Sequence, residues 1–249
     1  MATESLMVDV TRNWAVACEV QERFMEIPCV EPQTLTYSAR CRQLRALGGD
    51  CFSFLPLPGR RVALTVADAS GKGLPAALMI ANVQSSLRTA ALFAPGDVAA
   101  VVTAVNCQLH ASSPAERYAT VFYGVFDEDT RTLQYVNAGH NPPMVIRGGD
   151  SVTWLETGGP PVGVFADTVY QTGAVQLNLD DLIVAYTDGV IEAANTAGEE
   201  WGVGGLLSAV AACQMRQPDR IVEAAFTGLD DFSGQRQTDD ATVLAAVVN

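Results

Sequence analysis

The sequence predicts an α+β domain in which helices pack on layers of β-sheet. Segments with the two-residue period of strands occur in groups, and the helical segments lie between the groups rather than after every strand. Of the 249 residues, 49% are apolar and 17% are charged, which supplies a core and differs from the composition of disordered chains. We therefore expect one large folded domain rather than two small ones.

An amphipathic helix is predicted over residues 10–24. Its apolar residues recur three or four positions apart and share one face: Val10, Trp14, Ala17, Val20 and Phe24. Pro28 and Pro32 break the pattern, so residues 1–33 are assigned to this helix and a connector, and residues 34–249 to the folded domain. The apolar face either packs on that domain or pairs with a second copy of the chain, or with a sensor or activator protein.

The first part of the domain is predicted to form three strands followed by two helices. Period-two runs indicate strands at 34–41, 51–57 and 61–66, and Pro58-Gly59 supplies the turn between the last two. After a turn at 70–73, Pro75 suits the first turn of a helix that continues to residue 94. A second helix is expected at 97–110, directly after Pro95-Gly96.

The second part returns to the strand period before it ends in helices and one more strand. Strands are predicted at 119–126, 132–137, 143–147, 168–175 and 182–187. A polar loop at 195–200 leads to helices at 203–213 and 218–229, where the apolar residues have helical spacing. The apolar run at 241–248 is the final strand.

Charge and hydropathy limit the classes of partner. A net charge of −13 and a pI near 4.4 disfavour nucleic acid and favour divalent cations. Every apolar run is shorter than the roughly 18 residues that cross a bilayer, and the N-terminus lacks the pattern of a secretory signal. We therefore expect a cytoplasmic protein without a membrane partner. Six scattered cysteines without a CxxC pair are then expected to be free thiols.

Aspartates stand where predicted strands begin or end. Asp50 follows two glycines, Asp68 and Asp188 follow strands, and the pair Asp239-Asp240 precedes the last strand. Carboxylates at strand ends bring hard oxygen ligands to one edge of a sheet, and neighbouring glycines let the backbone approach an ion. The alternative for each residue is an aspartate that only caps a helix or shapes a turn.

Five short motifs occur in a fixed order along residues 34–248. They are Gly48-Gly49-Asp50, Val66-Ala67-Asp68-Ala69-Ser70-Gly71-Lys72-Gly73, Asn137-Ala138-Gly139-His140-Asn141-Pro142-Pro143, Tyr186-Thr187-Asp188-Gly189-Val190-Ile191-Glu192 and Thr238-Asp239-Asp240-Ala241-Thr242. Together they resemble the PPM family of protein phosphatases. The resemblance is to its bacterial branch, typified by the stage II sporulation phosphatase and the regulators of sigma-factor partner switching.

The resemblance implies an α-β-β-α sandwich of two central antiparallel sheets with a metal site at one end. In it Asp68 would bridge two Mn²⁺ or Mg²⁺ ions and the Ala69 carbonyl would bind the second. Asp188 and Asp239 would complete the first metal, with Asp50 in an outer position or on an additional ion. Asp240 could take the place of Asp239. We expect the three catalytic carboxylates to be Asp68, Asp188 and Asp239.

The reaction implied is removal of phosphate from phosphoserine or phosphothreonine by a metal-activated water. By resemblance the substrate is a regulatory protein, an anti-sigma-factor antagonist of the STAS type. One alternative is a partner-binding regulator that has lost turnover on the same fold, and another is a metal-stabilised structural domain. A homodimer formed through the N-terminal helix is possible.

Several other residues are considered for the site. Arg45 lies five residues before Asp50, the spacing of the phosphate-binding arginine in eukaryotic members, and the alternative for it is a solvated surface arginine. His140 could serve as a general acid, although a hydrogen-bonded structural role is the preferred reading. His110 suits a helix end, and Lys72 the surface. Ser53 replaces an aspartate of the branch, and this loss would reduce metal affinity or activity.

Overall fold

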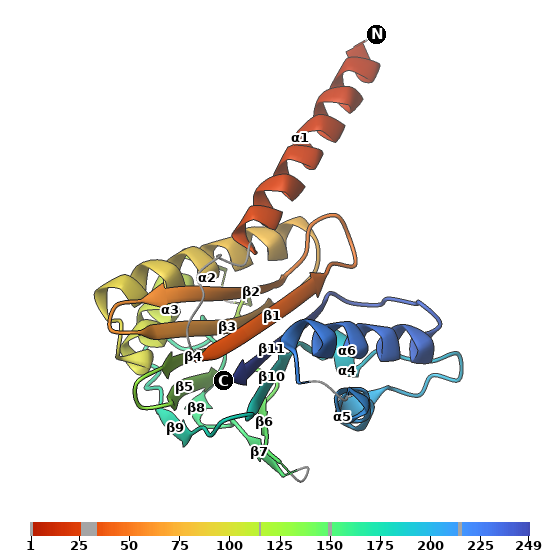
Figure 1. The fold of residues 1–249 in the computed structure, drawn as a ribbon. Helices are drawn as coiled ribbons and strands as arrows, with labels where there is room; N and C mark the ends of the chain where they lie inside the picture. The colour runs from red at the N-terminus through yellow and green to blue at the C-terminus, as the bar shows by residue number, and fades with distance from the viewer. Residues whose placement is uncertain (1, 26–33, 115, 149–150, 214–215) are drawn as a thin grey trace.

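The computed structural model describes residues 2–25, 34–114, 116–148, 151–213 and 216–249, with side chains from residue 12 onward. Two β-sheets stack face to face, with one pair of helices on the outer face of each sheet (Figure 1). This arrangement is the predicted α-β-β-α sandwich.

The first sheet has the strand order β1-β11-β10-β6-β7, all antiparallel. Its strands are β1 (Leu35–Arg42), β11 (Ala241–Val248), β10 (Leu182–Tyr186), β6 (Met144–Ile146) and β7 (Val152–Trp154). Every residue of β11 is buried, because the strand is covered on both faces. Its continuous apolar run reflects this two-sided burial.

The second sheet has the order β2-β3-β4-β5-β8, and β9 also pairs with β5. Its strands are β2 (Asp50–Leu57), β3 (Arg61–Ala69), β4 (Ala119–Asp127), β5 (Thr132–Ala138), β8 (Gly158–Gly159) and β9 (Gly173–Gln176). All pairs are antiparallel except the two-residue pair of β5 and β8. β3 reaches Ala69, three residues beyond its predicted end, because Asp68 pairs with Asp50 on one side and Thr120 on the other.

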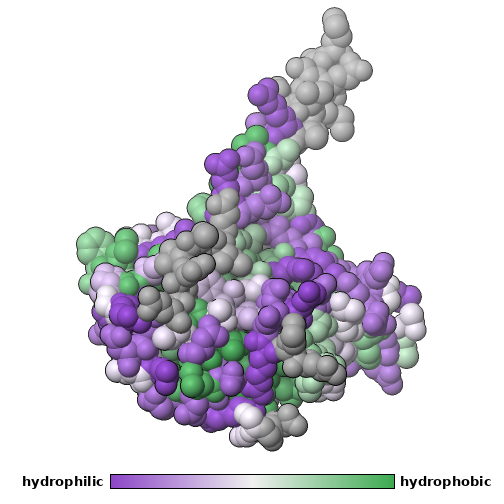
Figure 2. Space-filling view, in the orientation of Figure 1, coloured by the Kyte–Doolittle hydropathy of each residue, from purple (hydrophilic) through white to green (hydrophobic). Residues whose placement is uncertain are grey.

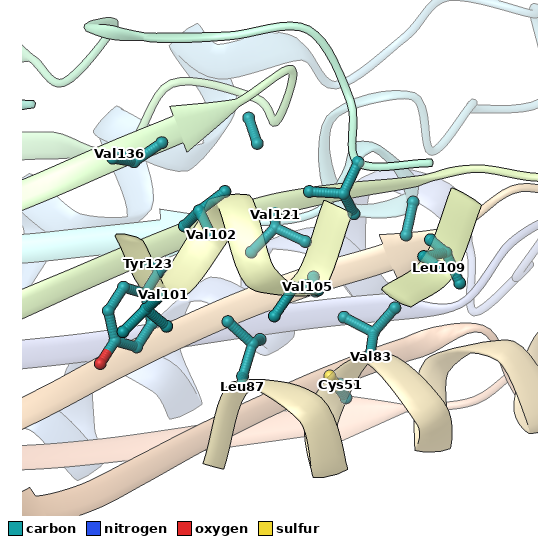
Figure 3. Close-up of a cluster of buried hydrophobic side chains, with 14 of the residues drawn as sticks. Cys51, Val83, Leu87, Val101, Val102, Val105, Leu109, Val121, Tyr123 and Val136 are labelled. Carbon is teal, nitrogen blue, oxygen red and sulfur yellow. The ribbon is translucent and has the colours of Figure 1, made fainter. Parts of the chain in front are cut away.

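Three apolar layers hold the sandwich together. Phe54, Phe122 and Leu244 lie in the layer between the sheets, where the Phe54 ring stacks on Tyr37 with 3.9 Å between centroids. Helices α2 (Leu74–Phe93) and α3 (Val98–Ser112) cover the second sheet through the cluster shown in Figure 3. Helices α5 (Gly202–Ala212) and α6 (Pro218–Ser233) cover the first sheet.

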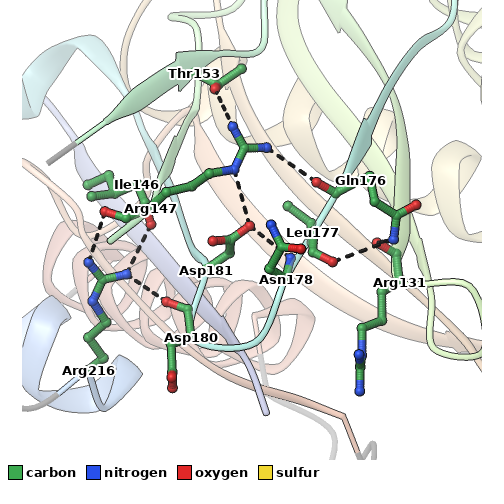
Figure 4. Close-up of polar contacts among 10 residues, drawn as sticks. All are labelled: Arg131, Ile146, Arg147, Thr153, Gln176, Leu177, Asn178, Asp180, Asp181 and Arg216. Carbon is green, nitrogen blue, oxygen red and sulfur yellow. Dashed lines mark hydrogen bonds and ion pairs between the residues drawn. The ribbon is translucent and has the colours of Figure 1, made fainter. Parts of the chain in front are cut away.

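A polar network lies at the N-terminal end of β10 (Figure 4). The Arg147 guanidinium pairs with buried Asp181 at 3.3 Å and donates to Thr153 at 2.8 Å. Arg216 donates to the carbonyls of Ile146, Arg147 and Asp180, which ties the α5–α6 connection to the sheet. This network anchors the strand that delivers Asp188 at its other end.

Helix α1 (Ala2–Phe24) begins eight residues before its predicted start and projects away from the sandwich (Figure 1). Only its last turns reach the domain, where Gln84 of α2 donates to the Phe24 carbonyl. Trp14 and Val20 of the apolar face stay exposed. Hydrophilic side chains cover much of the described part of this projecting helix, with apolar side chains among them (Figure 2). The predicted connector falls at residues 26–33, outside the described residues, so the domain boundary stays a prediction.

Other differences from the predicted elements concern short segments. The strand predicted at 168–175 is wrong over most of its length, because only residues 173–176 pair with β5. The short strands β7 and β8 and helix α4 (Asp188–Ile191) were not predicted. No helix in the described residues has the length and apolar content to span a membrane. Cys18, Cys41, Cys51 and Cys107 are free thiols, as predicted, and Cys29 lies outside the described residues.

Candidate metal centre

Both sheets bring their aspartate-bearing strand ends to the same end of the sandwich. β2 begins at Asp50 and β3 ends beside it, since Asp50 and Asp68 are direct partners across the ladder. The first sheet joins them through Asp50, whose carboxylate binds threonines of β11 and the end of β10. Asp188 follows β10, and Asp239 and Asp240 precede β11. The sandwich thus gathers the acidic residues that the sequence marks as separate junctions.

Asp50 fastens the two sheets to each other. Its side chain is 1% exposed, and its Oδ2 atom accepts hydrogen bonds of 2.7 Å from both Thr187 and Thr242. Burial raises the pKa of Asp50 to about 7, against the lowering effect of the two hydroxyl donors, and Asp240 raises it further. With Oδ2 occupied by the hydroxyls, Oδ1 is the atom that remains for an outer interaction with an ion.

Asp68 lies at the focus of the negative charge. Burial is the largest cause that raises its pKa to about 9, and the carboxylates of Asp50, Asp188, Asp239 and Asp240 raise it further in that order. Burial and the neighbouring Asp239 also raise the pKa of Asp188. Such mutual repulsion shows that the site is short of positive charge, which a divalent cation would supply.

Asp239 and Asp240 have different surroundings. Both oxygens of buried Asp240 accept backbone hydrogen bonds of 2.7 Å, from the amides of Leu44 and Gly49. Asp239 is half-buried, and its Oδ2 pairs with the Lys72 ammonium. Asp240 therefore stabilises the Gly48-Gly49 turn before β2. The carboxylate of Asp239, by contrast, is already paired with the Lys72 ammonium.

Glycines permit the close approach of the backbone segments. A Cβ atom on Gly189 would overlap the carbonyl oxygen of Asp240, and one on Gly49 would lie 3.0 Å from the Ala69 oxygen. The Ala69 amide also donates to the Gly49 carbonyl at 3.0 Å. The Ala69 carbonyl thus lies at the edge of the acidic cluster.

The donor set is oxygen only, the type that Mg²⁺ and Mn²⁺ bind. In the described parts of the chain, no three His, Cys, Asp or Glu side chains already converge closely enough to hold an ion. The neighbouring carboxylates repel one another, and a cation bound between them would attract each of them. The chemistry of the residues therefore fits a divalent metal centre.

The remaining sequence candidates occupy separate positions. Arg45 is exposed, and its Nη1 atom lies 3.4 Å from the Cβ position of Gly73, beside the 70–73 turn. Lys72 is a half-exposed surface residue but pairs with Asp239. Ser53 is buried in β2 opposite Thr65, about 10 Å along the strand from Asp50. His110 is exposed in the last turn of α3, as predicted.

His140 is a buried residue next to the centre. Its Nδ1 atom lies 2.9 Å from the hydroxyl of Thr120, the cross-strand partner of Asp68, and its amide donates to Asn137 at 2.7 Å. Burial lowers the pKa of His140 from its usual 6.5 to about 4, and the Tyr186 carbonyl offsets part of this effect. His140 therefore stays neutral at pH 7, in a hydrogen-bonded structural setting.

This pKa shift predicts a pH-dependent part of the stability. Between pH 6.5 and 4 the unfolded chain binds a proton at His140 that the folded chain does not, so the free energy of unfolding falls as pH falls through this window. The shift corresponds to about 3 kcal/mol. Urea unfolding at pH 7 and pH 4.5 should show a larger loss for the wild-type protein than for His140→Gln. Equal losses in both proteins would contradict the buried neutral imidazole.

Sequence reasoning missed the hydroxyls that hold Asp50. Thr187 and Thr242 both lie inside the motifs that carry aspartates, and each stands at the end of an apolar strand. A threonine that ends such a strand and faces the same layer as the core can donate to a buried carboxylate. That signal was present in the sequence.

The chain is similar to a known protein family. Residues 58–249 match the family described as Stage II sporulation protein E. IcfG of Synechocystis is 23% identical over an alignment of 257 positions, which covers 93% of this chain and 40% of IcfG. The phosphoserine phosphatase RsbU of Bacillus subtilis is 27% identical over 181 residues, which cover 71% of this chain and 52% of RsbU. The chain therefore spans about half or less of the length of these relatives.

Solved structures show the same fold. The RsbU and RsbW domains of a Mycobacterium tuberculosis protein superpose with a TM-score of 0.74 at 28% identity, covering 87% of this chain and 60% of that one. The SiaA PP2C domain of Pseudomonas aeruginosa gives 0.83 at 19% identity and covers both chains fully. The catalytic domain of the serine/threonine phosphatase PstP, in complex with two manganese ions, gives 0.65 at 18% identity, covering 86% of this chain and 98% of PstP. The chain belongs to the Stage II sporulation protein E family of PPM phosphatase domains.

Proposed function

We propose that this protein removes phosphate from phosphoserine or phosphothreonine of a regulatory protein, using two Mn²⁺ or Mg²⁺ ions. The observation that carries the proposal is the position of Asp68, whose pKa four neighbouring carboxylates raise together with burial. Such a concentration of carboxylates at one end of the fold costs stability unless cations bind there. The relatives RsbU and RsbP are named phosphoserine phosphatases, which supports the reaction class.

Each aspartate has a separate role in this proposal. Asp68 would bridge the two ions, and Asp188 and Asp239 would complete the first. The Ala69 carbonyl would bind the second ion, which its place beside Gly49 supports. Asp50 would act from the outer position, because two threonines hold one of its oxygens. Asp240 is assigned to bracing the Gly48-Gly49 turn instead of replacing Asp239.

When bound, the ions would supply an activated water and neutralise charge on the phosphoryl group. The chain's own residues hold the reactants in place. Asp68, Asp188 and Asp239 would hold the ions, and the hydrogen bonds of Asp50 link the ends of the two sheets. Arg45 lies beside the 70–73 turn and forms no hydrogen bond or ion pair with a described residue, which supports assigning its guanidinium to the phosphoryl oxygens.

The test measures phosphate release by protein purified without metal. We expect hydrolysis of p-nitrophenyl phosphate and of a phosphoserine form of a STAS-type anti-sigma-factor antagonist after Mn²⁺ is added, and a return to background after chelation. Hydrolysis that persists fully with chelator, or that never rises above the buffer rate at any Mn²⁺ concentration, would overturn the proposal.

A second candidate function is a partner-binding regulator without turnover on the same fold. The observation in its favour is the ion pair between Lys72 and Asp239, which satisfies a proposed metal ligand without a metal. This function predicts that a phosphoprotein partner is captured equally with chelator present and by the Asp188→Asn variant. Capture that requires Mn²⁺ supports the enzyme instead.

We also infer that helix α1 passes a signal from a partner or a second copy to the centre. Buried Gln21 of α1 donates to the Gly48 carbonyl at 2.8 Å and accepts from the Gly48 amide at 3.2 Å. The next amide, of Gly49, binds Asp240. A single side chain thus joins the helix to the turn that begins β2.

Replacement of Gln21 should therefore change the rate without changing assembly. We expect Gln21→Ala to alter kcat by about 3- to 30-fold, the size of effect for a residue that connects two coupled sites. Glu22→Ala, at an exposed position of the same helix, is the matched control and should leave kcat unchanged. Deletion of residues 1–26 should change either the oligomeric state, measured as mass by light scattering, or the rate of phosphate release. Wild-type values for both the deletion and Gln21→Ala would argue against a regulatory helix.

A further inference from the structure

A groove runs between the first half of α2 and the end of α3. It has a volume of about 370 Å³ and is lined by Pro75, Leu78, Met79, Asn82, Ser112, Ser113, Pro114 and Arg117. Leu78 is 66% exposed on its wall, and the nearby Leu74 and Tyr118 are also exposed. An apolar side chain of another molecule could be buried here.

The end of the groove formed by Arg117 is hydrogen-bonded to the 70–73 turn, which follows Asp68. Arg117 Nη1 donates to the Ser70 carbonyl at 3.0 Å, and this guanidinium fills the space that a Cβ atom on Gly71 would occupy. The Ser70 amide donates to the Tyr118 carbonyl at 2.9 Å, and the Tyr118 amide donates to the Ser70 hydroxyl at 3.1 Å. Ser70 is two residues from Asp68, so these hydrogen bonds connect the Arg117 end of the groove to the strand end that carries Asp68.

Arg117 supplies positive charge at this opening in a chain of net charge −13. Within the described parts of the chain, its guanidinium makes one hydrogen bond, to Ser70, although an arginine carries five N–H donors. The other donors can pair with phosphoryl oxygens, which arginine binds with two parallel hydrogen bonds. Phosphate and apolar recognition therefore lie side by side.

We propose that this groove docks the phosphorylated segment of the substrate protein, with an apolar residue next to the phosphoserine against Leu78 and the phosphoryl group on Arg117. The inference rests on the proposed phosphatase function and specifies its substrate. It predicts a preference for phosphoserine segments with a large apolar neighbour. A deletion of that neighbour would leave the chemistry intact and weaken docking.

The test compares two synthetic phosphoserine peptides that differ only in leucine or serine beside the phosphoserine, with p-nitrophenyl phosphate as a small substrate. With Mn²⁺, wild-type protein should prefer the leucine peptide by about 10-fold in kcat/KM, the effect of one apolar side chain in a pocket. Leu78→Ser should abolish the preference and leave the p-nitrophenyl phosphate rate unchanged. Arg117→Gln should raise KM for both peptides. Arg117→Lys should raise KM less, because the charge is kept.

The matched control is Leu92→Ser. Leu92 is 62% exposed on the same helix, about 21 Å from Leu78, and this change should keep the preference. A preference that survives Leu78→Ser, or its absence in the wild-type protein while p-nitrophenyl phosphate is hydrolysed, overturns the groove proposal. No Mn²⁺-dependent hydrolysis of any of the three substrates would overturn the phosphatase function instead.

Discussion

Asp68→Asn should lower Mn²⁺-dependent hydrolysis of p-nitrophenyl phosphate by about 10³-fold or more. The loss of one preorganised hydrogen-bond donor from an active site costs about 10² to 10³ in kcat, and the loss of a charged metal ligand should cost no less. An asparagine keeps the volume and one oxygen but removes the charge that would bridge two ions. The rate at saturating Mn²⁺ is the measurement.

A second readout separates lost metal binding from lost folding. Mn²⁺ should raise the thermal unfolding temperature of the wild-type protein and have a smaller effect on Asp68→Asn, because a ligand that binds only the folded state stabilises it. Asp129→Asn, at an exposed turn where Asp129 pairs with Arg60, is the matched control and should behave as wild type. A variant with wild-type activity and a wild-type response to Mn²⁺ would exclude Asp68 as the bridge.

The strands that frame the centre were predictable because they are long and buried. β11 carries eight consecutive apolar or threonine residues, and β2 and β3 have clear turn residues between them. β8 could not be predicted, since two glycines have no side-chain pattern and their pairing depends on the approach of Asn137. At 168–175 the pattern was misleading, because Val169 is exposed while Tyr170 packs in the core.

The residues of the candidate site also fall into those that the sequence marks and those that it does not. Asp50, Asp68, Asp188 and Asp239 lie in short local motifs, so the sequence marks them before any fold is known. Gln21 and Arg117 carry no local signal. Their contacts join residues 27 and 47 positions apart, which only the packing of α1 and the end of α3 brings together. The aspartates proposed as metal ligands were therefore marked by motifs, whereas Gln21 and Arg117, to which we assign signal transfer and substrate docking, were not.

Gly189→Ala should lower the rate by displacing the backbone, although it changes no carboxylate. The new methyl group would overlap the Asp240 carbonyl oxygen and lie 3.1 Å from the Asp239 Cβ atom. To relieve this overlap, the start of α4 must move away from the start of β11, which carries Asp188 away from Asp239. We expect a loss of about 1–3 kcal/mol in unfolding free energy, as for other overpacked sites. The rate should fall about 10²-fold, the effect of a displacement near 1 Å.

Gly204→Ala is the matched control, because Gly204 lies in helix α5 with no atom within 4 Å of its Cβ position. The same added methyl should stabilise the protein there by about 0.5–1 kcal/mol through helix propensity and leave the rate unchanged. Urea unfolding and phosphate release measured on both variants distinguish the effects. If Gly189→Ala keeps wild-type stability and rate, Asp188 and Asp239 do not need this close contact. If the rate falls at unchanged stability, the contact serves the placement of the two carboxylates alone.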